Sequence, residues 1–230
     1  MMKASRWAVS AALCASLGVA GTASAADDGW YVVGFAGEAG AQNINQGTLD
    51  QNVIDVFGSI GLSVVGATSD LDDSDTGFGL AGGYQVNPYF AAELAYVDLG
   101  DISYQANGTV TDGVDTFDAG LGIDQSASGP VFSILGIWPI GERFSLFGRV
   151  GLALMSVDVD ATVSLGGESA SDSAGTDRSN MVYGIGGEVS FSRDFGIRLG
   201  WDRYAEVGSD DLAGDVDIDL ISLGLRYNFN

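Results

Sequence analysis

The chain has 230 residues, a formal net charge of −22 and 46% hydrophobic residues, with 35 glycines and only three prolines. The acidity argues against a nucleic-acid partner, because like charges repel. The hydrophobic content argues against disorder as the reason for the glycines. The length suits one large β domain or a small pair of domains.

The first 25 residues have the layout of a secretory signal peptide. Lys3 and Arg6 precede an apolar run at 7–19, and an A-x-A cleavage site ends at Ala25. The apolar run is too short to cross a membrane as a helix. We expect cleavage after Ala25, which leaves residues 26–230 as one mature domain.

Cleavage at this site changes the charge and the residue types of the mature chain. Cys14 raises the alternative of a lipoprotein signal, but Leu13 stands before it, where such signals carry a small residue. Without Lys3 and Arg6, seven of the nine basic residues remain against 31 acids, so the charge becomes −24. The mature chain has no lysine, cysteine or histidine, and no apolar run long enough for a helical span. If it crosses a membrane, it must do so as a closed barrel.

The stretch TGFGLAGGYQV at 76–86 alternates in an inside-out manner. With one exception, every second residue is bulky, and the residues between are Gly, Ala or Gln. Alternation is typical of a strand. A face of small residues suits the tight interior of a small barrel, with the bulky residues outside. The outward set is Phe78, Leu80, Gly82, Tyr84 and Val86, and the inward set is Gly77, Gly79, Ala81, Gly83 and Gln85.

The same alternation recurs in the other predicted strands. The segment at 129–140 is apolar on both faces, and its orientation stays unassigned. The remaining predicted outward residues are Tyr31, Val33 and Phe35; Leu94 and Tyr96; Phe144, Leu146, Val150, Leu152 and Leu154; Met181, Tyr183, Ile185, Val189 and Phe191; Phe195, Ile197, Leu199 and Trp201; and Ile221, Leu223, Leu225, Tyr227 and Phe229.

These strands number eight, an even count, as closed outer-membrane barrels have. We therefore predict an all-β fold, a closed antiparallel eight-stranded transmembrane β-barrel with up-and-down topology. Short periplasmic turns are expected at 87–88, 141–143 and 193–194, and long outer loops at 40–75, 101–125, 158–180 and 205–216. The alternating connection lengths are typical of bacterial barrels, and they predict that the protein resides in the cell outer membrane.

The chain resembles the OmpA-like transmembrane domain, an eight-stranded outer-membrane barrel family. The similarity covers most of the mature chain in order, and the order and spacing of the stretches make it specific. The stretches that carry it are GFGLAGGYQVNPYFAAELAYVDLG at 77–100, FSLFGRVG at 144–151, YGIGGE at 183–188, GIRLGWDRYAEVG at 196–208 and LISLGLRYNF at 220–229.

The resemblance implies a lumen filled by acid–arginine pairs. The matching positions are Glu93, Arg149, Glu188 and Arg198. Buried charges need partners, and Glu188 and Arg198 should face each other across a short turn. Where the family often has a lysine, Ile134 stands nearby, which predicts a network that is looser or apolar on that side. The four residues either plug the lumen or form a gated ion path.

The resemblance also implies an assembly signal at the chain's end. Gly224, Tyr227 and Phe229 match the C-terminal pattern that the outer-membrane assembly machinery recognises, although the family pattern ends on the aromatic and this chain adds Asn230. Other expected partners are outer-membrane lipids, lipopolysaccharide and a surface ligand bound through the loops. No nucleic acid is expected.

Two further segments carry alternatives. Asp70, Asp72, Asp73 and Asp75 form an acidic segment that is either a solvated face or a weak calcium loop; it lacks the glycine and closing glutamate of an EF-hand. The segment at 47–61 is either an amphipathic helix or a hairpin extension of the flanking strands. The residues of the predicted helical face are Leu49, Val53, Val56, Phe57 and Ile60, with a capping box of Thr48 and Gln51.

Two classes of function remain. Barrel enzymes of the outer membrane use a histidine base, and the mature chain has none, so we expect no enzyme activity and no cofactor. The first class is a structural or surface-interaction protein with a plugged lumen. The second is a narrow porin-like channel for ions or small solutes. Conductance discriminates between them.

Overall fold

The computed structural model describes residues 29–207 and 216–229. The predicted signal peptide at 1–25 and most of the predicted connection at 205–216 lie outside these ranges. In the described ranges, no helix is long and apolar enough to cross a membrane.

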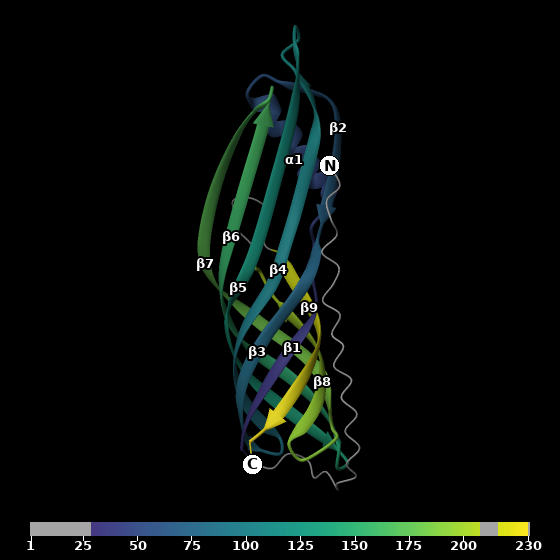
Figure 1. The fold of residues 1–230 in the computed structure, drawn as a ribbon, viewed down its shortest axis with the longest axis vertical. Helices are drawn as coiled ribbons and strands as arrows, with labels where there is room; N and C mark the ends of the chain where they lie inside the picture. Colours follow the sequence, from purple (N-terminus) through teal and green to yellow (C-terminus); the bar gives the residue numbers. More distant parts are fainter. Residues whose placement is uncertain (1–28, 208–215, 230) are drawn as a thin grey trace.

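Strands dominate the described chain (Figure 1). The elements are β1 (Gly29–Gln42), α1 (Gln46–Ser59), β2 (Ser63–Asp72), β3 (Ser74–Asn87), β4 (Phe90–Thr111), β5 (Thr116–Ile140), β6 (Phe144–Leu165), β7 (Glu168–Ser190), β8 (Phe195–Tyr204) and β9 (Asp217–Asn228).

Eight of these strands close into a ring. β1 pairs with both β3 and β9, and β4 pairs with β5, so the sheet closes on itself. All pairs are antiparallel, and the order around the ring follows the chain. The predicted closed up-and-down barrel is confirmed. The remaining strand, β2, lies outside the ring and pairs with residues 103–111 of β4.

The three predicted short turns are confirmed at one end of the barrel, but two predicted long loops are wrong. Segments 101–125 and 158–180 are strand, apart from a turn at 112–115 in the first and a two-residue turn at 166–167 in the second. β4 to β7 have 22 to 25 residues each, about twice what a bilayer crossing needs. Figure 1 shows them rising as a tall curved wall above the rest of the barrel.

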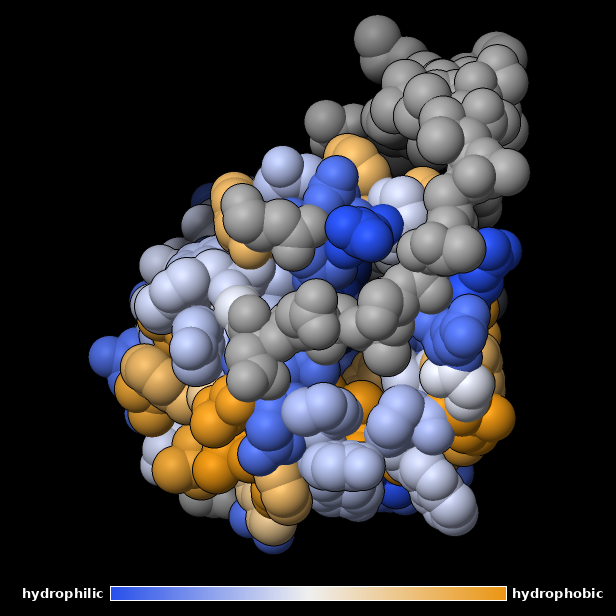
Figure 2. Space-filling view, turned by 90° about the horizontal axis from the view of Figure 1, so that it is seen from below, coloured by the Kyte–Doolittle hydropathy of each residue, from blue (hydrophilic) through white to orange (hydrophobic). Residues whose placement is uncertain are grey.

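The outward face of the barrel carries a belt of exposed apolar side chains. On each of β3 to β9 they occupy alternate positions near the short-turn end. Seen from that end, hydrophobic residues gather in patches at the outer margin (Figure 2). For β3, β4, β6, β7 and β9 the predicted facing is confirmed. Representative members are Leu80, Tyr96, Phe132, Ile134, Leu152, Ile185, Leu199, Leu223 and Leu225.

The predicted facing of β1 is wrong. Tyr31 and Val33 are 1% exposed and point inward, whereas Trp30 is 65% exposed and joins the belt. Glycines on β3 make room for this bulk. A Cβ on Gly83 would overlap the Tyr31 ring, and a Cβ on Gly79 would overlap the Phe35 ring. The face of β1 is therefore set by its neighbour rather than by its own alternation.

Of the two alternatives for segment 47–61, the helix is confirmed as α1, and the hairpin extension of the flanking strands is wrong, because the strand that follows, β2, pairs with β4. The predicted capping box is wrong: the N-cap is Asn45, whose side chain accepts a hydrogen bond from the Gly47 amide at 2.9 Å. Asn45 is one of the residues that cap helices best, so the N-cap lies three residues upstream of Thr48. Phe57 alone is buried on the helix.

Hydrogen bonds hold α1 against β2 and β4. Gln46 donates to the Ser69 carbonyl at 3.0 Å and hydroxyl at 2.8 Å. Tyr104 of β4 donates its hydroxyl to the Asp50 carboxylate at 2.6 Å. Burial and the Asp50 carboxylate raise the pKa of Tyr104 to about 12.

A pH prediction follows from this contact. A tyrosine whose pKa is raised on folding stabilises the contact fully below its ordinary pKa, about 10, and loses that contribution as pH rises through about 12. We expect α1 to loosen between about pH 10 and 12. The tyrosinate absorbance of wild type minus that of Tyr104→Phe, measured against pH, should show a single step near pH 12. A difference step near the ordinary tyrosine pKa of about 10 would contradict the contact.

Candidate functional site

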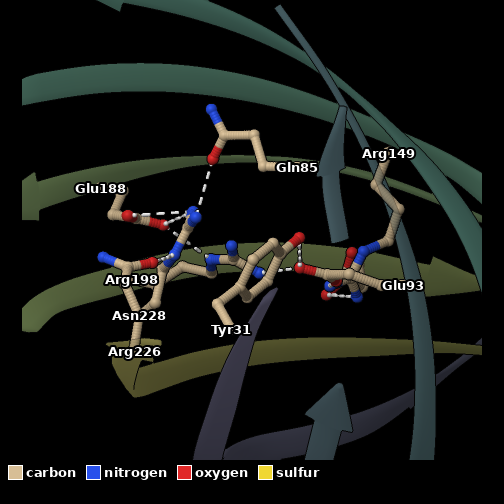
Figure 3. A network of polar contacts seen from close by, with 9 residues as sticks. Tyr31, Gln85, Glu93, Arg149, Glu188, Arg198, Arg226 and Asn228 are labelled. Carbon is tan, nitrogen blue, oxygen red and sulfur yellow. Dashed lines mark hydrogen bonds and ion pairs between the residues drawn. The ribbon is translucent and has the colours of Figure 1, made fainter. Parts of the chain in front are cut away.

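A carboxylate inside the barrel collects three donors. Glu93 on β4 has a fully buried side chain. It accepts hydrogen bonds from the Tyr31 hydroxyl at 2.8 Å, from Arg149 at 2.8 Å and from Arg198 at 2.5 Å. Figure 3 shows these groups converging from different strands of the barrel. A buried carboxylate satisfied by two guanidinium groups is strongly held in one position.

A second carboxylate continues the network toward the short-turn end. Glu188 accepts from Arg198 at 3.2 Å and pairs with Arg226 at 3.2 Å. Arg226 also donates to Gln85 and to Asn228, at 2.7 Å each. The guanidinium of Arg226 lies 3.8 Å from the centre of the Tyr31 ring, a cation–π contact. Each arginine is thus held by more than one partner.

Asp202 on β8 completes the network. It pairs with Arg149 at 3.0 Å. Three carboxylates and three arginines therefore share the lumen, and their formal charges sum to zero. This balance matters because an uncompensated charge in a confined interior is costly. We call this set the lumen network: Glu93, Glu188, Asp202, Arg149, Arg198 and Arg226, with Tyr31, Gln85 and Asn228 bonded to it.

The structure brings together all four charged residues that the sequence singled out. Glu188 and Arg198 lie opposite each other in the β7–β8 register. Asp202, Arg226 and Tyr31 were missed. Alternation on the last two strands already places Asp202 and Arg226 inward, so the signal for these two existed; Tyr31 was hidden by the inverted facing of β1.

Ile134 does not enter the lumen. It is 61% exposed on the outward face of β5. Its neighbours Ser133 and Leu135, 6% and 0% exposed, point inward instead. The predicted looser side of the network therefore consists of a hydroxyl and a leucine.

Apolar layers lie above the lumen network. Along β6, Arg149 is followed on the inward face by Gly151, Ala153, Met155 and Val157, and the last three are 0% exposed. On β5 the inward residues at this height, Ala127 and Val131, are also apolar, whereas β7 and β8 contribute the buried Asn180 and Tyr204. The fill is thus polar toward the short turns and mostly apolar toward the long hairpins. The other apolar residues of these layers are Val97, Leu99, Val182, Ile218 and Leu220.

A small cavity marks the boundary between the two fills. It measures about 10 Å³ and is lined in part by Arg149, Arg198, Asp202 and Ser222. Arg149 Nε and Asp202 Oδ1 are buried without a protein partner. A polar cavity of this size suits a single bridging water, which is too little for a continuous aqueous path.

Charge reversal of a single pair should not restore the lumen network, because its arginines bond to more than one carboxylate or amide. Arg198 bonds both Glu188 and Glu93, so Arg198→Glu would place a carboxylate against Glu93. We expect each of Glu188→Arg and Arg198→Glu to destabilise by about 3–5 kcal/mol. Combining them should recover little. Urea unfolding in lipid vesicles, arranged as a double-mutant cycle, measures this. Near-complete recovery would mean that the two residues form an isolated pair.

The acidic segment is not a loop. Asp70 and Asp72 lie on β2, and Asp75 lies on β3, with Asp73 between the strands. In the described part of the chain, no three acidic, histidine or cysteine side chains are arranged to hold a metal ion. We therefore do not propose a calcium site there. The acidic residues Asp210, Asp211 and Asp215 lie outside the described ranges.

Comparisons with known proteins agree with this architecture. The profile of the OmpA-like transmembrane domain matches residues 25–230. The chain is 31% identical over 155 residues to outer membrane protein A of Klebsiella pneumoniae, covering 66% of this chain and 41% of that protein. The Shigella flexneri protein is 27% identical over 158 residues, covering 68% and 41%. The chain thus matches about two fifths of these curated relatives.

Among solved structures, the attachment invasion locus protein Ail of Yersinia pestis covers 88% of this chain and 99% of its own, with 20% identity and a TM-score of 0.38. The family profile spans nearly the whole chain from Ala25 onward. The described strands close into a barrel whose outer face is apolar. The chain therefore belongs to the OmpA-like transmembrane domain family and resides in the outer membrane.

Proposed function

We propose that this protein is a closed barrel that supports the outer membrane and presents a surface to the cell exterior. One observation carries the proposal: the lumen is filled by two different layers in series. The charge-balanced lumen network closes the periplasmic half. The apolar layers around Met155 close the outer half. Ions would have to displace both.

The belt supports the structural part of this role. Its side chains present an apolar surface to lipid around the ring, and the ring has no open edge at that depth. Outer-membrane lipids and lipopolysaccharide are the proposed partners of the belt.

The wall formed by the outer parts of β4 to β7 supports the surface role. Above the belt, the outward positions become acidic and hydroxylic, as at Ser156, Asp158 and Asp160. Such a face attracts divalent cations, which can bridge to lipopolysaccharide phosphates. It also offers a polar surface for adhesion. We propose no catalytic activity and no cofactor, because the mature chain lacks a histidine base.

Shortened hairpins test the two parts of this role separately. In a strain that lacks the protein, wild type should restore the barrier to detergents. A variant with 102–125 and 157–176 each replaced by a two-residue turn, which joins the paired residues Asp101 and Ser126 and the paired residues Ser156 and Asp177, should restore the barrier but not surface attachment. Heat-modifiable migration in gels shows whether each variant folds. Equal attachment by a folded shortened variant would overturn the surface role, and failure of wild type to restore the barrier would overturn the structural one.

The second candidate, a narrow channel, rests on the same lumen network. The small cavity beside Arg149 is the feature that favours it, because water there could join a transient path. Such a path would still have to cross the apolar layers. Conductance decides between a closed barrel and a channel.

A further inference from the structure

A groove lies outside the barrel between α1 and the wall. Its volume is about 310 Å³, within the range of sites for small molecules. α1 contributes Asp50, Val53 and Ile54 to it, and β2 and β4 contribute the other lining residues. These are Val64, Val65, Gly66, Ala67 and Ser69 of β2 and Tyr104 and Ala106 of β4.

The groove is fixed at both ends of the helix. Gln46 bonds to Ser69 near the helix start, and the buried ring of Phe57 packs near its end. Tyr104, which is 4% exposed, bonds to Asp50 between them. The helix is therefore held at a set distance from β2, and the groove exists without a ligand. A preformed site avoids the cost of ordering it on binding.

The described lining of the groove is mostly apolar and carries a single negative charge. Valine, isoleucine and alanine side chains form its walls. Among the described lining residues, Asp50 alone is charged, and it is half-buried. Hydrogen bonds from Tyr104 and Ser69 hold the pKa of Asp50 below its ordinary value, so it stays ionised at neutral pH. An apolar wall beside one carboxylate complements an apolar body that carries one positive charge.

We infer that this groove binds a small amphiphilic cation, with an apolar body against Val53, Val64 and Ala67 and a protonated amine on Asp50. The walls would remove apolar ligand surface from water. The Asp50 carboxylate would form a charge-assisted hydrogen bond with the ammonium group. This site adds small-molecule recognition to the surface role, and it stands or falls independently of whether the lumen conducts.

Four probes separate the two contributions. Tryptamine has an indole body and an ammonium group; tryptophol has the same body and no charge, and indole-3-acetate has the opposite charge. Ethylamine keeps the charge and lacks the body. Calorimetric titration of the full protein in phosphatidylcholine nanodiscs, with empty nanodiscs subtracted, measures each. We expect saturable binding of tryptamine at least about tenfold tighter than that of the other three.

A matched pair of variants locates the charge. Asp50→Asn removes the charge and keeps an acceptor for Tyr104. Asp55→Asn makes the same change five residues later on α1, at a residue that does not line the groove and that accepts a hydrogen bond from Gln51. We expect Asp50→Asn to weaken tryptamine about tenfold and Asp55→Asn to leave it unchanged. Heat-modifiable migration confirms that both variants fold.

Three results would overturn the inference. Equal weakening by both variants would mean that the general acidity of the surface, rather than Asp50, attracts the cation. Equal binding of tryptophol and tryptamine would mean that the groove selects apolar bodies without regard to charge. Absence of saturable tryptamine binding would mean that the groove is not a site for this class. None of these results bears on the closed lumen, so the inference and the proposed function fail separately.

Discussion

Glu93→Ala should lower the free energy of unfolding by about 3–5 kcal/mol, because it removes one partner of a buried ionic network. Arg149 would keep only Asp202, Arg198 would keep only Glu188, and the Tyr31 hydroxyl would lose its acceptor. The lumen would then hold three arginines against two carboxylates. Urea unfolding of protein refolded into lipid vesicles measures the loss.

Glu142→Gln is the matched control, because Glu142 lies exposed in the turn between β5 and β6. It removes the same charge outside the lumen network, and the expected change is within about 0.5 kcal/mol. Glu93→Gln should fall between the two, since it keeps an acceptor for Tyr31. A cost for Glu93→Ala similar to that for Glu142→Gln would mean that the lumen is wet enough to solvate its charges.

Phe229→Asp should abolish assembly in cells while costing little stability in lipid. We propose that Phe229 and Tyr227, with Gly224, form the signal that the assembly machinery recognises. Phe229 lies at the short-turn margin of the belt, 52% exposed. A charge at that depth costs only about 0–1 kcal/mol. Recognition and stability therefore separate: outer-membrane fractions should lack the variant, whereas refolding in vitro should succeed.

Phe144→Asp is the matched control, since Phe144 begins β6 at the same end and is 39% exposed. The same charge enters a similar environment, but outside the last strand. It should assemble in cells. Loss of both variants from the outer membrane would point to a general intolerance of charge at this margin and would contradict a C-terminal signal.

Alternation carried much of the fold prediction. For β3, and for β9 from Ser222 onward, each inward residue is small or polar and most outward residues are bulky, so one strand suffices to read its facing. This rule fails for β1, because the bulky side chains of Tyr31 and Val33 point inward. The space for these side chains is left by glycines on the paired strand, such as Gly83 opposite Tyr31. Which residues face each other depends on the pairing of the whole sheet, so the sequence of β1 alone does not show it.

The long hairpins were hidden by their polarity. Segment 158–180 is rich in Ser, Asp and Gly, which resembles a loop, yet its turn is readable. Gly166 and Gly167 both have positive φ, 60° and 93°, the arrangement that a two-residue hairpin turn requires. A Gly-Gly pair between alternating stretches was therefore the missed signal.

The lumen network could be predicted only in part. Alternation places Asp202 and Arg226 inside, but it does not say at which height each side chain ends. Height depends on strand tilt and stagger around the ring. Arg198, for example, reaches Glu93 from a strand that is not its neighbour in the sheet. Such contacts across the lumen leave no mark on local sequence.

Conductance across a planar lipid bilayer tests the closed lumen most directly. Wild-type protein, refolded and shown to be heat-modifiable, should give no regular openings above the background of protein-free bilayers. The lumen is closed by the lumen network and by the apolar layers in series, so we expect no openings. Regular, reproducible openings from the folded protein would contradict the account and establish the narrow channel instead.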